Sequence, residues 1–270
     1  MLTADLAWLY NNHFWLVTMR DLETGNIDAP AGWHVAVLTF DDGAESQFLW
    51  NAQHVPTPTC SVGVLEAFQA AHPTWPVTAT FYLNQSPWAT DSVAKMQWLV
   101  AHGFELGNHT WDENNLGGLD AAQIEKVVGE EQAYIERAVP GYVPVSFALP
   151  YGIAPTNPQD RQALLDGTYQ GTKWHFEGIA LVGASVSASP FSRNWSIQIP
   201  RIQEVDPSLL PTGDLPYIMA GVEERFAKDP AAFYTSGGNP DYIPFPAADA
   251  SLLSPAYAAK ADPIAAGKAP

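Results

Sequence analysis

Residues 35–43 read VAVLTFDDG, and this stretch decides the fold. The run from Val35 to Phe40 is apolar apart from one threonine, which predicts a strand buried on both faces. Asp41 and Asp42 follow at once, and Gly43 permits a tight turn after them. Two adjacent carboxylates at the mouth of an apolar strand repel each other and lose hydration unless a positive group lies beside them. Taken alone, the segment is more simply an ordinary turn after a strand.

The rest of the chain alternates apolar, strand-like segments with segments of helical periodicity. We expect strands near residues 35–40, 78–83, 104–108, 143–149, 176–182 and 197–202. We expect helices near 3–12, from 61, and near 92–102, 120–138, 158–166 and 216–228. This alternation predicts parallel β/α units, whose active sites lie at the carboxyl ends of the strands. After Pro240 the chain becomes rich in alanine and proline and loses periodicity, so residues 241–270 are expected to be a flexible extension of a domain spanning 1–240.

Two further strand ends carry polar or turn-forming residues. Residues 107–113 read GNHTWDE and place His109 and Glu113 four positions apart. If the chain turns helical there, the two side chains share one face, and an imidazole with a carboxylate suits a divalent cation. Alone, such a pair is more often a helix-surface pair. The third strand end, 147–152, reads FALPYG and forces a turn through Pro150-Tyr151-Gly152.

Composition excludes several classes of function. Twelve basic residues face 29 acidic ones, a formal charge of −17, so nucleic acid and anionic membranes are not expected partners. Cys60 is the one cysteine, which excludes an intrachain disulfide and a cysteine-rich zinc site. Any metal ligands must therefore be Asp, Glu or His. No apolar run reaches the length of a membrane helix, and no signal peptide is visible after Met1. No feature of the sequence specifies an oligomeric state.

The three strand ends, taken together and in this order, resemble the polysaccharide deacetylase family (NodB homology, carbohydrate esterase 4). Its pattern is T-F-D-D-G, then H-[ST]-x-x-H, then R-x-P-[YFW]-G, and the resemblance spans roughly residues 1–205. It includes residues 79–82, 105–110, 182–184 and 199–202. The resemblance implies an α/β fold, a distorted (β/α) barrel, holding one divalent transition metal.

Position by position, the resemblance implies a role for each motif residue. Asp41 would be the general base, and Asp42 and His109 would be metal ligands. Glu113 falls where the family has its second ligand histidine. The backbone N–H of Tyr151 would help to hold the oxyanion. The implied substrates are N-acetylglucosamine polymers, such as chitin oligomers or peptidoglycan, and the implied location is extracellular or in the cell envelope.

Several positions depart from the family pattern. Glu113 makes the ligand set harder than two histidines would, so Mn²⁺, Fe²⁺ or Co²⁺ can replace the Zn²⁺ that the resemblance implies. Ala148 stands where the family has the arginine that orients the base, so Asp41 is expected to lack that partner. The family's general-acid histidine has no clear match. His175 is the only later histidine and is a candidate replacement acid, although a histidine at a strand start explains it more simply.

Three functions remain open on these residues. The first is a metal-dependent carbohydrate N-deacetylase. The second is a degenerate domain that binds carbohydrate or has a structural role in the envelope. The third keeps metal-dependent hydrolysis but acts on another amide or ester. Because relatives typically carry an export signal and a first strand upstream, we expect the natural gene product to be longer or to have lost that strand.

Overall fold

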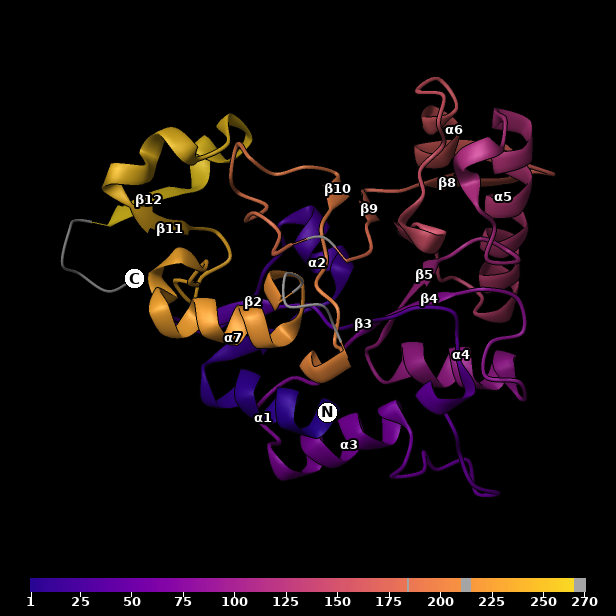
Figure 1. The fold of residues 1–270 in the computed structure, drawn as a ribbon, viewed down its shortest axis with the longest axis horizontal. Coiled ribbons are helices and arrows are strands. Elements are labelled where there is room, and N and C mark those ends of the chain that lie inside the picture. Colours follow the sequence, from indigo (N-terminus) through magenta and orange to yellow (C-terminus); the bar gives the residue numbers. More distant parts are fainter. Residues whose placement is uncertain (184, 210–214, 265–270) are drawn as a thin grey trace.

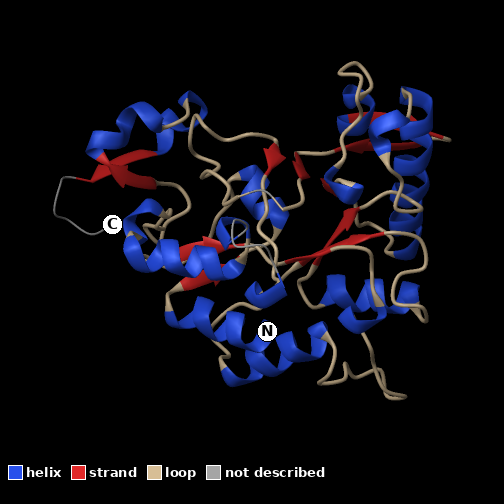
Figure 2. Cartoon of the chain, in the orientation of Figure 1, coloured by secondary structure: helices blue, strands red, loops and turns tan. Residues whose placement is uncertain are grey.

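The computed structural model describes residues 1–183, 185–209 and 215–264. Its centre is a six-stranded parallel sheet in the order β10-β9-β6-β5-β4-β3. The strands lie at Thr39–Phe40 (β3), Thr80–Leu83 (β4), Glu105–Asn108 (β5), Ser146–Ala148 (β6), Gly178–Ala180 (β9) and Gln198–Ile199 (β10). The sheet is curled like part of a barrel, with helices packed outside it (Figures 1 and 2).

A shorter parallel pair extends this sheet through the segment that contains the first motif. Strand β1, Phe14–Leu16, pairs with β2, His34–Ala36. The Ala36 carbonyl still accepts from the Val17 amide, whereas the Leu38 carbonyl accepts from the Thr80 amide. The chain therefore changes partner between residues 36 and 38. The prediction of a single strand at 35–40 was wrong in this respect, because the two halves of this segment pair with different neighbours.

The helices occupy most of the expected positions. They are α1 (Leu2–Asn11), α2 (Met19–Thr24), α3 (Ser61–Ala71), α4 (Ser92–Ala101), α5 (Ala121–Ala138), α6 (Arg161–Leu165) and α7 (Met219–Lys228). The long helix α5 begins with a capping box in which Asp120 and Gln123 each accept from the other's backbone N–H. Its buried face carries Ile124, Val128 and Ile135, which recur at helical spacing. Among the helices of residues 1–183, 185–209 and 215–264, none combines the length and the apolar character that a membrane span requires.

Helix α2 was not expected from the sequence, and it lies against the concave side of the sheet. Met19 packs with Tyr82, Ala148, Ala180 and Ile199 in one buried cluster. The Arg20 backbone N–H donates to the Glu105 carboxylate at 3.0 Å. This short helix therefore fills the interior of the partly closed barrel.

Two further strand pairs lie outside the central sheet. Strands β7, Asp166–Tyr169, and β8, Thr172–His175, form an antiparallel hairpin that packs against α5. Beyond residue 240, where we expected an irregular extension, β11 (Ile243–Pro246) pairs with β12 (Ala261–Ile264). Figure 1 shows this pair in a lobe beside α7. Residues 265–270 of the expected flexible tail lie outside the described residues, and the flexibility of the extension stays a prediction.

Candidate active site

Three loops leave one edge of the central sheet. Asp41 and Asp42 follow β3, His109 follows β5, and the turn Pro150–Gly152 follows β6. These strands are parallel, so their carboxyl ends lie at the same edge. The fold therefore brings together three segments that are far apart in the sequence.

The side chains of Asp42, His109 and Glu113 converge on one point. His109 Nε2 lies 3.3 Å from Asp42 Oδ1 and 3.1 Å from Glu113 Oε2. One ligand atom from each residue lies within 4.8 Å of the other two. Within residues 1–183, 185–209 and 215–264 this is the one such group of His, Cys, Asp or Glu side chains. The three residues expected to bind a metal thus lie where a single ion could contact all of them.

The backbone of the third motif orients the imidazole. His109 is 2% exposed, and its Nδ1 lies 2.8 Å from the carbonyl oxygen of Ala148. A carbonyl can only accept, so Nδ1 carries the proton and donates it. Nε2 then faces the two carboxylates, where it can either carry a second proton or offer its lone pair to a cation, as metal-binding histidines do.

Glu113 reaches His109 through a turn rather than through a helix. Thr110 and Glu113 have φ angles of 65° and 50°, which exclude an α-helix across this segment. The Asn84 amide holds the turn by donating to the carbonyls of His109 and Thr110 at 2.8 and 3.0 Å. The same amide lies 3.3 Å from Glu113 Oε2. The expected helical i, i+4 geometry was therefore wrong, although the two side chains do meet.

Arg201 supplies the partner that Asp41 was expected to lack. Its two terminal nitrogens each donate to one Asp41 oxygen at 2.7 Å, and one also donates to the Thr39 hydroxyl at 3.0 Å. Its Nε donates to the Leu181 carbonyl, and the guanidinium lies 5.4 Å from the centre of the Tyr82 ring. The arginine missing at Ala148 is thus replaced by one that follows β10.

The site carries more negative than positive charge. Burial lowers the pKa of His109, but its hydrogen bond to Asp42 and the charges of Asp41 and Glu113 outweigh burial and raise it. The hydrogen bond from His109 lowers the pKa of Asp42, whereas burial raises the pKa of Glu113. A proton on Nε2 and a metal ion would occupy the same place between the carboxylates. The raised pKa of His109 therefore reflects an environment that attracts a cation.

Tyr151 lies at the same edge with its side chain turned to solvent. Tyr151 is 62% exposed, and its φ of 56° is unusual for a residue other than glycine. Such backbone conformations cost on the order of 1–3 kcal/mol and are concentrated at functional sites. The expected role of its backbone N–H in holding an oxyanion stays a proposal.

His175 lies elsewhere. It ends β8 and pairs with Asp166 across the β7–β8 hairpin, in an exposed position. Three residues later the chain enters β9 at Gly178, so His175 is at the amino edge of the sheet, opposite the three motif loops. The interpretation of His175 as a replacement acid is corrected accordingly, since the hairpin holds it away from Asp42 and His109.

Sequence reasoning missed two residues of the site. Asn84 directly follows β4, so the argument used for the three other strand ends also applies to it. Arg201 lies in the stretch 199–202 that resembles the family, but nothing local in the sequence indicates that it contacts Asp41. That contact depends on the curl of the sheet, which brings the end of β10 over β3.

Comparisons with known proteins show which family this chain belongs to. The family model described as polysaccharide deacetylase matches residues 28–169, just over half of the chain. The chitooligosaccharide deacetylase of Bradyrhizobium sp. (strain ANU 289) is 28% identical over 123 residues, which are 46% of this chain and 48% of that relative. The chain therefore matches about half the length of this curated relative.

A solved structure confirms the fold. The Streptococcus pyogenes deacetylase PplD, solved in complex with acetate, superposes with a TM-score of 0.58 at 14% identity. The alignment covers 80% of this chain and 85% of PplD, so the expected distorted (β/α) barrel is confirmed. From the motifs, the family model and the shared fold it follows that the chain belongs to the polysaccharide deacetylase family, as a divergent member.

Proposed function

We propose that this protein is a metal-dependent hydrolase that removes N-acetyl groups from a polysaccharide containing N-acetylglucosamine. One observation carries the proposal: the ligand atoms of Asp42, His109 and Glu113 lie within 4.8 Å of one another. Beside them, Asp41 is held by Arg201 through two hydrogen bonds of 2.7 Å. This arrangement provides both a cation site and an adjacent base.

The donor set fits a divalent transition metal. The imidazole nitrogen faces two carboxylates, and its other nitrogen is fixed by the Ala148 carbonyl. Family resemblance favours Zn²⁺, whereas the oxygen ligand from Glu113 favours Mn²⁺, Fe²⁺ or Co²⁺ more than a second histidine would. When bound, such an ion acts as a Lewis acid on an acyl oxygen.

Asp41 is the group positioned to accept a proton. Arg201 donates once to each of its oxygens. Each carboxylate oxygen has two lone pairs, so the arginine leaves capacity on both. A charged carboxylate in this position can act as a base for an attacking water. The backbone of Tyr151 completes the proposal as an oxyanion donor at the neighbouring strand end.

The proposed substrate and location come from family membership. Chitin oligomers and peptidoglycan strands are the substrates proposed, and the extracellular space or cell envelope is the proposed location. The curated relative from Bradyrhizobium carries the name chitooligosaccharide deacetylase. The strongly negative charge of this chain is compatible with an uncharged polymer such as chitin and unfavourable for nucleic acid.

A degenerate domain that binds carbohydrate without turnover is the second candidate. It is favoured by the position of His175 on the far edge of the sheet, which leaves the histidine candidate for the general acid outside the site. Against it stands the Arg201–Asp41 contact, because a binding domain has no need of an oriented base.

Acetate release from N-acetylglucosamine oligomers tests the two candidates. Asp41→Asn keeps the shape but removes the base and one of the two hydrogen bonds from Arg201, so we expect at least about a 100-fold loss of kcat with the metal retained. An exposed control, Asp249→Asn, should match the wild type. If the wild-type protein loaded with metal released no acetate from any such oligomer yet bound them, the degenerate-domain proposal would replace ours.

A further inference from the structure

Tyr82 is a buried aromatic residue at the end of β4, next to the candidate site. It is 0% exposed, and its side chain lies on the concave side of the sheet in the same cluster as Met19. None of the described residues forms a hydrogen bond with its hydroxyl. The contacts that account for this residue are therefore those of its ring.

The backbone of the neighbouring strand fixes the position of this ring. Gly107 on β5 is the register partner of Tyr82. A Cβ added to Gly107 would overlap the Cδ1 and Cε1 atoms of the tyrosine ring. A glycine inside a strand commonly marks such a close approach. The ring thus occupies the space that a side chain at position 107 would need, and the sheet itself holds it in place.

The ring contacts two groups of the candidate site. The guanidinium carbon of Arg201 lies over the ring of Tyr82, 5.4 Å from its centre. This separation is within the roughly 6 Å over which a cation is attracted to an aromatic face. The His109 ring centre is 6.5 Å away, in a tilted arrangement. One side chain therefore contacts both the partner of the proposed base and a proposed metal ligand.

The attraction to the ring acts on the charge of Arg201, which its hydrogen bonds do not replace. Those bonds run to Asp41, Thr39 and the Leu181 carbonyl. They fix the directions of the N–H groups, which lie in the plane of the guanidinium. The arginine side chain is only 12% exposed, so little water screens its attraction to the ring.

We propose that Tyr82 is a positioning residue, whose ring holds the Arg201 guanidinium in place and so fixes the orientation of Asp41. The effect on catalysis rests on the proposed function, whereas the hold on Arg201 does not. The ring face is required and the hydroxyl is not. Phenylalanine should therefore replace Tyr82, and an aliphatic residue should not.

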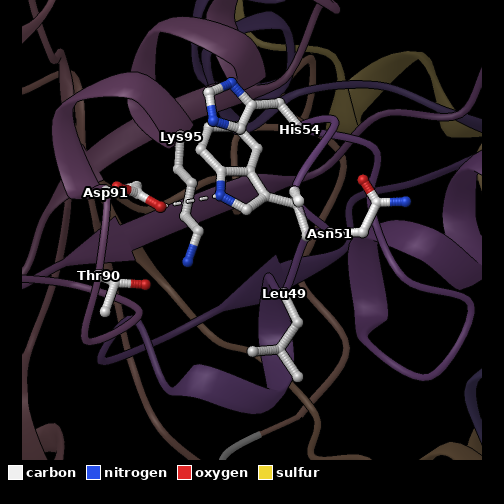
Figure 3. Close-up of a pocket in the computed structure, with 8 residues that line it drawn as sticks. Leu49, Asn51, His54, Thr90, Asp91 and Lys95 are labelled. Atoms are coloured by element: carbon white, nitrogen blue, oxygen red, sulfur yellow. Dashed lines mark hydrogen bonds between the residues drawn. The ribbon is translucent and has the colours of Figure 1, made fainter.

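A second buried cation beside an aromatic ring provides a matched control. The Lys95 ammonium lies 5.7 Å from the centre of the Trp50 ring, and both residues line a cavity of about 260 Å³ (Figure 3). The residues that line this cavity in the described chain include none of those that form the candidate site. Trp50→Leu thus removes a contact of the same kind without touching Arg201.

Hydrogen exchange of the Arg201 Nε–H, followed by NMR, tests the hold on the guanidinium without any substrate. The signal is assigned by its absence from Arg201→Lys. We expect exchange at least about tenfold faster in Tyr82→Leu and in Tyr82→Met than in the wild type. Tyr82→Phe and Trp50→Leu should exchange as the wild type does. Thermal melting checks that each variant folds, and methionine provides a second variant without a ring.

Steady-state kinetics test the consequence for the base. In Tyr82→Leu and Tyr82→Met we expect kcat for acetate release to fall by about tenfold, with KM and metal content unchanged. Tyr82→Phe should restore kcat, and Trp50→Leu should keep it. A residue that served stability alone would lower Tm in the aliphatic variants and leave both kcat and the exchange of Arg201 unchanged.

The outcomes separate this proposal from the deacetylase itself. Unchanged exchange in both aliphatic variants of Tyr82, equally fast exchange in Tyr82→Phe, or a wild-type kcat in the aliphatic variants overturns the positioning role. Faster exchange that Tyr82→Phe reverses supports the hold on Arg201. That result would stand even if the wild-type protein released no acetate, in which case the deacetylase proposal alone would fail.

Discussion

At the scale of single residues, the arginine that contacts Asp41 lies at a different strand end from the one that the family pattern gives. Ala148 offers no guanidinium, yet Asp41 is held by Arg201 through two bonds of 2.7 Å. The carbonyl of Ala148 instead orients His109. In the proposed mechanism the base is therefore still held by an arginine, which follows a different strand from the one that the family pattern gives.

Arg201→Lys should disable the site while preserving the fold. A lysine ammonium cannot donate in parallel to both oxygens of Asp41, so the carboxylate loses its fixed orientation. We expect kcat for acetate release to fall by about 100-fold, with a much smaller change in KM. The exposed control Arg137→Lys should behave as the wild type. Full activity in Arg201→Lys would show that the contact has no part in catalysis.

Glu113→His should restore the ligand set of the family. The position has a φ of 50°, a region that histidine adopts more readily than most residues. We expect the preference for zinc over manganese to increase by at least about tenfold, because imidazole replaces a hard oxygen ligand. Competition dialysis followed by elemental analysis measures it. An unchanged preference would mean that Glu113 is not a ligand.

At the scale of elements, helix α2 places an acid inside the barrel. Glu23 is 8% exposed, neither of its carboxylate oxygens has a hydrogen-bond partner, and it lies against Gly178. Burial, together with the charges of Glu105 and Glu177, raises its pKa from 4.5 to about 9. Glu23 is therefore protonated in the folded protein at neutral pH.

This raised pKa predicts the direction of a pH effect on stability. Between pH 4.5 and about 9 the unfolded chain releases the Glu23 proton and the folded chain keeps it. The unfolded state then binds fewer protons, so the free energy of unfolding falls as pH rises. Glu23→Gln should flatten this fall and stabilise the protein at pH 8 by about 1–3 kcal/mol. Urea unfolding at pH 5 and pH 8 measures it, with exposed Glu45→Gln as control. If the free energy of unfolding changed by the same amount between pH 5 and pH 8 in Glu23→Gln and in the wild type, the prediction would be contradicted.

The elements that could be predicted from the sequence are those with local causes. Asp120 with Gln123, and the spacing of Ile124, Val128 and Ile135, fix helix α5 without reference to the rest of the chain. Asp42 and His109 were found because polar residues directly follow apolar strands. The change of strand partner after Ala36, the β7–β8 hairpin and the Arg201 contact depend on distant pairings, so local pattern could not show them.

At the scale of the whole molecule, the chain beyond residue 240 packs onto the barrel. Ile243 is 3% exposed and lies in a cluster with Ile27, Ala29 and Phe191. Tyr257 and Phe191 are in edge contact, with ring centroids 5.1 Å apart. The lobe therefore covers apolar surface that belongs to the N-terminal part of the chain.

Ending the chain at residue 240 should destabilise the protein without changing the site. Exposing this cluster costs about 1.5–3 kcal/mol for each large side chain uncovered. In a chain of this size, each kcal/mol lost from the free energy of unfolding lowers Tm by about 2–4 °C. Differential scanning calorimetry of the shortened chain measures the shift. An unchanged Tm would instead support a flexible extension that contributes nothing to the barrel.

Elemental analysis of the purified protein tests the central claim, that one cation is held jointly by Asp42, His109 and Glu113. We predict one equivalent of transition metal per chain, which chelation removes together with acetate release and which added metal restores. In Asp42→Ala the metal should be absent while the circular dichroism spectrum is unchanged. A folded wild-type protein that binds no divalent metal, or an Asp42→Ala variant that keeps its full equivalent, would contradict the account.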